Sequence, residues 1–385
     1  MCNFKQICRK PFTKEPKYLL DTLSTISGQL INASFEIEQI KSASIFPEIA
    51  HNVDKYVLYW DLQYWDFFER FILELSYLLE NSLYLNSFID RVCAIYFDYL
   101  SLKLIHIPAL AYCIQVNRER KFGSETAYFS PNILGEDQKI GDVFWNQTYL
   151  ARLLAFNHEL YHLYFNLNPN KFVPDYERLH KLAVLYMGGI KADSERNQII
   201  LENLQKIQNS SWDKFLEEAA CDYRSLIQTV YMVRQAESGS EQSLVQHVRE
   251  IQDAFHINQT FLSNLSDIAI CWEAVYRAYV SANNEEEALK MVQPFFDRAS
   301  QSATIRNIII PDFLDKFICR KYGILSYVNI LDNNLVRFAF QKVTDIVADV
   351  NFMVYAAKES LKLMQLSYFN PFEMKDIVLS NAEYQ

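Results

Sequence analysis

The stretch His158-Glu159-Leu160-Tyr161-His162 is the only place where the histidines of this chain cluster. The residues around it predict one long helix over about 145–166. Because an α-helix turns about 100° per residue, side chains four positions apart lie one above the other. His158 and His162 can therefore reach one metal ion, with Glu159 beside them. Imidazole nitrogens suit zinc, and a third protein ligand would leave one coordination position for water.

The predicted helix is apolar around most of its circumference, which is typical of a buried helix. His158, His162 and Glu159 share the remaining arc with two alanines, and Arg152 lies at its margin. A buried helix should not carry two imidazoles and a carboxylate on one arc unless a partner satisfies them. Chance is the alternative, since the five-residue pattern arises in roughly one in a hundred chains of such composition.

The third ligand of such a site has to come from elsewhere in the chain. Metzincins place a histidine ten residues after the first one, with a glycine before it, but these positions hold Asn168 and Phe165. The upstream cysteines of a deformylase-type site would be Cys93 or Cys113, and neither lies in a glycine-flanked motif. A Glu-x-x-x-Asp pattern formed by Glu218 and Asp222 fits the requirement for a third ligand better.

Helix geometry distinguishes between the two adjacent glutamates of the run 211–234. Glu218 and Asp222 fall together at the edge of the apolar face, where a carboxylate can meet a buried partner. Glu217 and Cys221 are predicted to project to the opposite, solvent side. We therefore predict Glu218 as the third ligand. The alternative is an ordinary charged helix flank.

The two motifs together resemble those of gluzincin-type HExxH zinc metallopeptidases, over roughly residues 103–235. The resemblance implies that His158, His162 and Glu218 bind Zn²⁺ and that Asp222 orients a ligand histidine. It also implies that Glu159 is the general base when a zinc-activated water attacks a peptide bond of an intracellular protein. The chain is then expected to be a metalloendopeptidase.

The expected fold is mainly α with a small β-sheet. Short segments rich in β-forming residues, 104–108, 111–116 and 126–130, predict a sheet just before the histidine helix. This arrangement resembles a zincin-like catalytic core, in which the active-site helix packs beside a short sheet. By the same resemblance, residues 128–134 are the candidate edge strand for extended substrate, with a plain connecting hairpin as the alternative.

Helical regions are expected on both sides of this core. We predict an N-terminal helical region over 1–102, which is strongly helical from residue 56 onward. The metallopeptidase core spans 103–236 and carries a helical insertion at 170–210, which serves packing or covers the cleft as a lid. A polar run after residue 236 marks the boundary to a C-terminal helical domain over 237–385.

The composition of the chain limits which binding partners and which cellular compartment are expected. The 385 residues carry a net charge of −10, and no basic stripe favours nucleic acid or an anionic membrane. Seven cysteines without regular spacing predict reduced thiols in a cytoplasmic protein. Neither a membrane span nor a signal peptide is expected, because no apolar run is long enough. The expected partners are a protein or peptide substrate and a regulatory partner of the helical flanks.

Two questions stay open at the level of the sequence. The residue that stabilises the oxyanion could be an isolated histidine or a tyrosine of the second ligand helix: His106, His180, His247, His256, Tyr223 or Tyr231. The chain could also be a non-proteolytic helical interaction or regulatory protein that retains a metallopeptidase-like metal site. Stoichiometric zinc without cleavage of any protein would indicate this second function.

Overall fold

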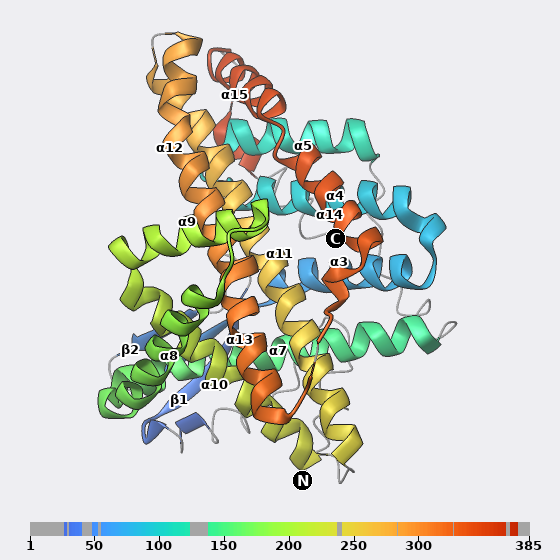
Figure 1. Cartoon of the computed structure of the whole chain (residues 1–385). Helices are drawn as coiled ribbons and strands as arrows, with labels where there is room; N and C mark the ends of the chain where they lie inside the picture. Colours follow the sequence, from blue (N-terminus) through green and yellow to red (C-terminus); the bar gives the residue numbers. More distant parts are fainter. Residues whose placement is uncertain are drawn as a thin grey trace.

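The structure is a computed structural model that describes residues 27–28, 31–40, 48–52, 55–123, 138–236, 241–282, 284–325, 327–366 and 370–375. Over these residues the chain is mainly helical with a small sheet, as the sequence predicts (Figure 1). The strands come first, and long helices follow. In chain order the elements are β1 (Phe35–Ile40), β2 (Glu48–Asn52), β3 (Lys55–Asp61), α3 (Leu62–Glu80), η1 (Ser82–Tyr84), α4 (Leu85–Lys103), α5 (Pro108–Phe122), α7 (Gln138–Leu167), α8 (Pro169–Gly189), α9 (Glu195–Ser210), α10 (Trp212–Ala236), α11 (Glu241–Ser281), α12 (Glu285–Thr304), η2 (Ile305–Ile309), α13 (Ile310–Tyr322), η3 (Ile330–Asp332), α14 (Asn334–Val347) and α15 (Val350–Met364).

The sheet of the described residues has the strand order β1-β3-β2. Its central strand β3 runs parallel to β1 and antiparallel to β2. Phe35, Leu58 and Trp60 contribute buried side chains from the sheet to a hydrophobic core. Asp61 then begins α3, because its side chain accepts a hydrogen bond from the backbone N–H of Gln63 at 2.8 Å.

The sheet does not lie where the sequence predicts it, and residues 56–61, predicted as helical, belong to strand β3 instead. Residues 111–116 belong to helix α5, and residues 104–107 form the turn that joins α4 to it, so these two predicted strands are wrong. Pro108 occupies the first turn of α5, where its fixed φ angle favours a helix and its missing N–H costs nothing. The third predicted strand, 126–130, and the candidate edge strand, 128–134, lie outside the described residues.

The histidine helix α7 is longer than predicted and contains the whole expected range. It packs against α3, α10 and α11. Arg152, which the sequence places at the margin of the histidine arc, forms a buried ion pair with Glu69 of α3. On the α10 side, Ser225 donates a hydrogen bond to the backbone oxygen of Leu154 at 2.7 Å. These contacts hold α7 in one position relative to its neighbours.

Helix α11 crosses the molecule, and α12 returns beside it (Figure 1). Its 41 residues span about 60 Å at 1.5 Å per residue. The buried apolar residues form two cores. The first core draws on β1, β3, α3, α4, α5, α12, α14 and α15, the second core draws on α8, α9, α10 and α13, and both include residues of α7 and α11.

The two cores extend across the regions predicted from the sequence. Residues of all three predicted regions contribute to the first core, and residues of the last two contribute to the second. The boundaries at 102 and 236 stay a prediction. Over the described residues, no helix combines the length and the apolar character needed to cross a membrane.

Candidate metal centre

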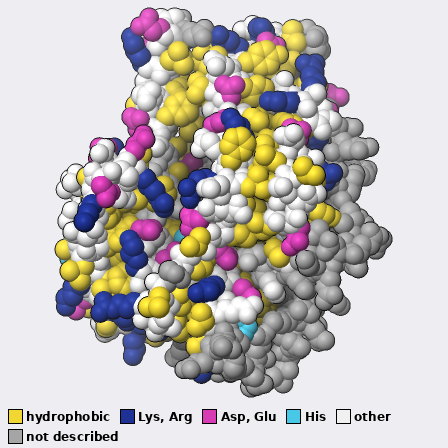
Figure 2. Space-filling model, turned by 45° about the vertical axis from the view of Figure 1, so that its right-hand side comes forward, with side chains coloured by type: hydrophobic (Ala, Val, Ile, Leu, Met, Phe, Trp, Pro, Cys, Tyr) yellow, Lys and Arg dark blue, Asp and Glu magenta, His cyan; other side chains and the backbone are white. Residues whose placement is uncertain are grey.

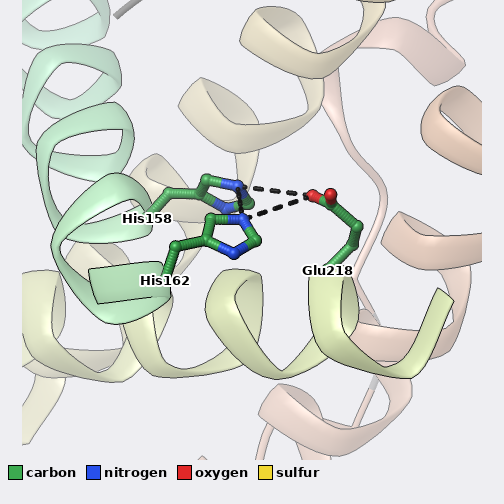
Figure 3. A group of neighbouring side chains, drawn as sticks. All are labelled: His158, His162 and Glu218. Carbon is green, nitrogen blue, oxygen red and sulfur yellow. Dashed lines mark hydrogen bonds and ion pairs between the residues drawn. The ribbon is translucent and has the colours of Figure 1, made fainter. Parts of the chain in front are cut away.

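Three side chains from α7 and α10 point toward one another (Figure 3). The Nε2 atoms of His158 and His162 lie 3.0 Å apart. Glu218 approaches both from α10, with its Oε2 atom 3.4 Å from the Nε2 of His158 and 3.6 Å from that of His162. Three potential ligand atoms therefore lie within 4.8 Å of one another. The sequence predicts this group, and the fold brings it together.

The spacing of the three atoms fits a tetrahedral metal site. Zinc binds imidazole nitrogens and carboxylate oxygens at about 2.0–2.2 Å, so neighbouring ligand atoms of a tetrahedral site lie about 3.3 Å apart. The observed separations of 3.0, 3.4 and 3.6 Å lie around that value. In the described part of the chain, no other group of three His, Cys, Asp or Glu side chains has such spacing. The donor set is the one that the sequence predicts for Zn²⁺.

A carboxylate lies at the second ring nitrogen of each histidine. The Nδ1 atom of His158 is 2.7 Å from Oδ1 of Asp222, which also accepts a 3.4 Å hydrogen bond from Gln259 of α11. The Nδ1 atom of His162 is 3.4 Å from Oε1 of Glu217. A carboxylate at Nδ1 favours the tautomer that carries its proton there, which leaves Nε2 free to bind a metal. The predicted orienting role of Asp222 matches its position.

The charges at the centre stabilise one another. Burial raises the pKa of Glu218, but hydrogen bonds from His158 and His162 outweigh it and hold the pKa well below its usual range. Burial lowers the pKa of His158, but the Asp222 carboxylate outweighs it, so the net pKa is raised. The Glu218 carboxylate thus stays ionised, as a metal ligand must.

Glu159 lies beside the three ligands and has the properties of a proton acceptor. Burial raises the pKa of its carboxyl group, and the two neighbouring histidines lower it, with a net rise. Among the described residues it forms no hydrogen bond or ion pair, in contrast to Glu218 and Asp222. Its side chain lines the cleft that opens beside the metal centre. A partly buried carboxylate with a raised pKa is suited to accept a proton near neutral pH.

The cleft has a volume of about 680 Å³, which lies within the range of ligand sites. Besides α7 and α10, its walls come from α3, α9, α11, α12, η2 and α13. Polar and charged residues that the sequence analysis did not single out line it. They are Ser210, Ser211, Lys214, Ser225, Asn258, Gln259, Arg298, Gln301, Ser302 and Arg306.

Cys221 does not lie on the solvent side of α10, where the sequence predicts it. Its side chain is fully buried rather than turned to solvent, because α10 packs against α7, α8, α9, α11 and α13 and keeps only a narrow exposed strip. Burial raises the pKa of its thiol. Glu217, predicted on the same solvent side, is half-exposed but also reaches His162. Neither residue was expected near the metal centre.

None of the described residues proposed for the oxyanion lines the cleft. His256 lies 2.6 Å from a carboxylate oxygen of Asp315, and His180 accepts a 2.9 Å hydrogen bond from Trp212. The others lie elsewhere: His106 near Glu273, Tyr223 beneath the cations of Arg178 and Lys321, Tyr231 on the surface and His247 on α11. Polar side chains of α11 and α12 line the cleft instead.

Comparisons of the chain with protein-family models, with curated proteins and with solved structures found no match. The geometry of the centre and its cleft are therefore the observations that bear on the function.

Proposed function

We propose that this protein is a zinc-dependent metallopeptidase of the gluzincin kind, which hydrolyses peptide bonds of a cytoplasmic protein. One observation carries the proposal. His158, His162 and Glu218 converge from two helices at distances that suit one zinc ion, and Glu159 lies beside them without a hydrogen-bond partner among the described residues. The contact between α7 and β2 supports a zincin-like core with the sheet beside the active-site helix. The free thiols of the described cysteines support a reducing compartment.

Each residue has a distinct task in this proposal. His158, His162 and Glu218 would hold Zn²⁺, which when bound polarises the scissile carbonyl and lowers the pKa of water. Glu159 accepts the proton of the attacking water and passes it to the leaving amine nitrogen. Asp222 holds the Nδ1 proton of His158 and keeps that ring oriented. The open cleft gives an extended polypeptide access to these groups.

Metal analysis tests the centre directly. Purified wild-type protein should contain close to one zinc per chain, and His162→Ala should remove most of it. His106→Ala is the matched control, because this exposed histidine lies near Glu273, outside the cleft. Equal zinc contents in all three proteins would exclude His162 as a ligand.

Glu159→Gln tests the catalytic role. The variant should keep its zinc but lose peptide cleavage by at least about 100-fold, the usual contribution of a general base. Proteomes exposed to wild-type protein, to Glu159→Gln and to the control Glu202→Gln would be compared by mass spectrometry. Glu202 is an exposed residue of α9 and should leave cleavage unchanged. Full activity of Glu159→Gln would rule out the general-base role, and zinc without any cleavage would indicate the non-proteolytic regulatory protein.

A further inference from the structure

Basic side chains line the same cleft as the three candidate metal ligands. Arg298 of α12 and Arg306 of η2 line the wall that also carries Gln301, Ser302 and Ile305. These positions follow a helical spacing of three to four residues, so one face of α12 and η2 borders the cleft along its length. Lys214 adds a third cation from α10, one turn before Glu218.

Within the described part of the chain, these cations form no ion pairs with acidic side chains. Arg298, Arg306 and Lys214 are exposed, and none forms an ion pair with another described residue. The carboxylate of Asp267 on α11 interacts electrostatically with Arg306 without forming an ion pair, and it accepts a hydrogen bond from Ser302. The acidic side chains of the cleft, Glu159, Glu218 and Asp222, belong to the metal centre.

The charge of the cleft differs from that of the whole chain. Three basic and three acidic side chains line it, so a bound divalent cation leaves the described lining with a net charge of +2, against −10 for the chain. In Figure 2, Lys and Arg side chains flank a hollow in the middle of the visible face, within which histidine and acidic side chains are visible. An acidic protein that exposes unneutralised cations in one cleft attracts an anionic ligand there.

We propose that this cleft selects polypeptide segments with acidic side chains on both sides of the bond placed at the metal centre. The proposal deepens the proposed function, on which its cleavage part rests. Arg298 and Arg306 are eight residues apart on one continuous helical wall, or about 12 Å. Side chains on one face of an extended peptide about four positions apart are separated by about 13 Å. Two Asp or Glu residues with that spacing match the two arginines.

The irregular helix η2 supports a role for this wall. Residues 305–309 form a π-helix between α12 and α13, and Ile305 and Arg306 on it both line the cleft. A π-helical turn widens the helix locally and is frequent at functional sites. Here it lies at the point where Arg306 enters the cleft.

A binding experiment tests the charge selection separately from cleavage. Intact Glu159→Gln protein with zinc is titrated against a short fluorescent peptide with two aspartates about four positions apart, and against the same peptide with asparagines. The aspartate peptide should bind about tenfold more tightly, as charge-assisted hydrogen bonds to two arginines predict. Adding Arg298→Gln and Arg306→Gln should remove the difference, and added salt should reduce it.

The matched control removes the same charge elsewhere. Arg178→Gln with Arg320→Gln takes two exposed cations from another pocket, beside Phe317, and should keep the preference for aspartate. Equal binding of the two peptides, equal losses in both double variants, or tighter binding of a single-stranded oligonucleotide would overturn the proposal.

Cleavage-site profiling of a peptide library with wild-type protein separates the two proposals. Cleavage with Asp or Glu enriched around the cut bond supports both, and cleavage without this enrichment leaves the peptidase but overturns the acidic preference. Selective binding without any cleavage leaves the charge-selective cleft and removes the peptidase.

Discussion

Each histidine of the candidate metal centre has a hydrogen-bonding environment that leaves only one of its ring nitrogens available for a metal. For His158 this environment consists of Asp222 at 2.7 Å, with Gln259 as a further partner of the same carboxylate. For His162 it is the longer 3.4 Å contact to Glu217, whose side chain is 43% exposed. The difference in distance and exposure predicts that Asp222 contributes more than Glu217 to metal affinity.

Asp222→Asn should therefore weaken zinc binding by about 10–100-fold, because the charge that orients and polarises His158 is lost. Glu217→Gln is the matched control on the same helix and should change affinity by less than about threefold, since solvent screens its contact. Competition with a chromogenic zinc chelator measures both. Equal losses in the two variants would contradict the distinction drawn from the distances.

Asp267 predicts a pH dependence of stability. Burial raises the pKa of this carboxyl group to about 7, although Arg306 and a hydrogen bond from Ser302 oppose the shift. In the unfolded chain the group ionises near pH 4, so between about pH 4 and 7 the folded protein holds a proton that the unfolded chain has lost. Because the folded pKa is the higher one, stability falls as pH rises through this window.

Asp267→Asn should remove that loss. The variant should exceed wild type in free energy of unfolding by roughly 2–4 kcal/mol at about pH 8, and by little near pH 4. Urea unfolding at several pH values measures the difference. Asp297→Asn, at an exposed position of α12, should show a constant offset instead. A pH-independent effect of Asp267→Asn would show that the carboxyl group ionises normally.

At the scale of elements, the centre depends on how α7 and α10 are held together. Asn157 donates a hydrogen bond to the hydroxyl of Thr229 at 3.0 Å, and only 1% of Asn157 is exposed. Ser225 bonds to the backbone of Leu154 one turn away. Both contacts lie within about one turn of His158 on α7 and two to three turns after Glu218 on α10, so they help to set the position of one helix relative to the other.

Thr229→Val should reduce the free energy of unfolding by about 1–3 kcal/mol, because it leaves the buried Asn157 amide without its oxygen partner. Combining it with Asn157→Leu replaces both partners by apolar groups and should recover part of that loss. Urea unfolding of the two single variants and the double variant gives the coupling. A double variant that loses the sum of the two single effects would indicate that the hydrogen bond contributes nothing.

The elements show where sequence reasoning works and where it fails. Helix α7 has 30 residues, enough turns for its helical period to be recognised in the sequence. In α10, the same helical period assigns Glu217 and Glu218 to different faces. The segment 111–116 is too short for its period to be recognised, because a short apolar run gives the same sequence pattern in a buried strand and in a buried helix. Cys221 was misplaced because its burial depends on helices distant in sequence, which the period of α10 does not reveal.

At the scale of the whole molecule, the centre lies where the two cores meet. Tyr64 of the first core and Phe215 of the second both line the cleft. Arg298 and Arg306 reach the same cleft from far along the chain. No local pattern connects them with His158, because only the return of α12 beside α11 brings them near. The convergence of His158, His162 and Glu218 was therefore predictable from sequence, and the walls of the cleft were not.

Removal of the metal should affect the entire unfolding transition. The ligands belong to α7 and α10, and α7 contributes to both cores, so a bound ion stabilises the folded chain as a unit. Free zinc at about 100 times its dissociation constant should add about 2.7 kcal/mol, and a chelator should remove it. Thermal unfolding of wild type, His162→Ala and the control His106→Ala measures this. A chelator effect that persists in His162→Ala would place the stabilising ion elsewhere.

Helix α11 has a practical consequence for anyone who wants a smaller protein. Its side chains complete both apolar interiors, and it supplies Gln259 behind the ligand histidine. Excising only the segment with the two ligand helices would strip α7 and α10 of a neighbour they both lie against. Such a fragment would expose large apolar surfaces to water and would aggregate. The shortest autonomous fragment that contains the candidate metal centre must retain sequence well past residue 236.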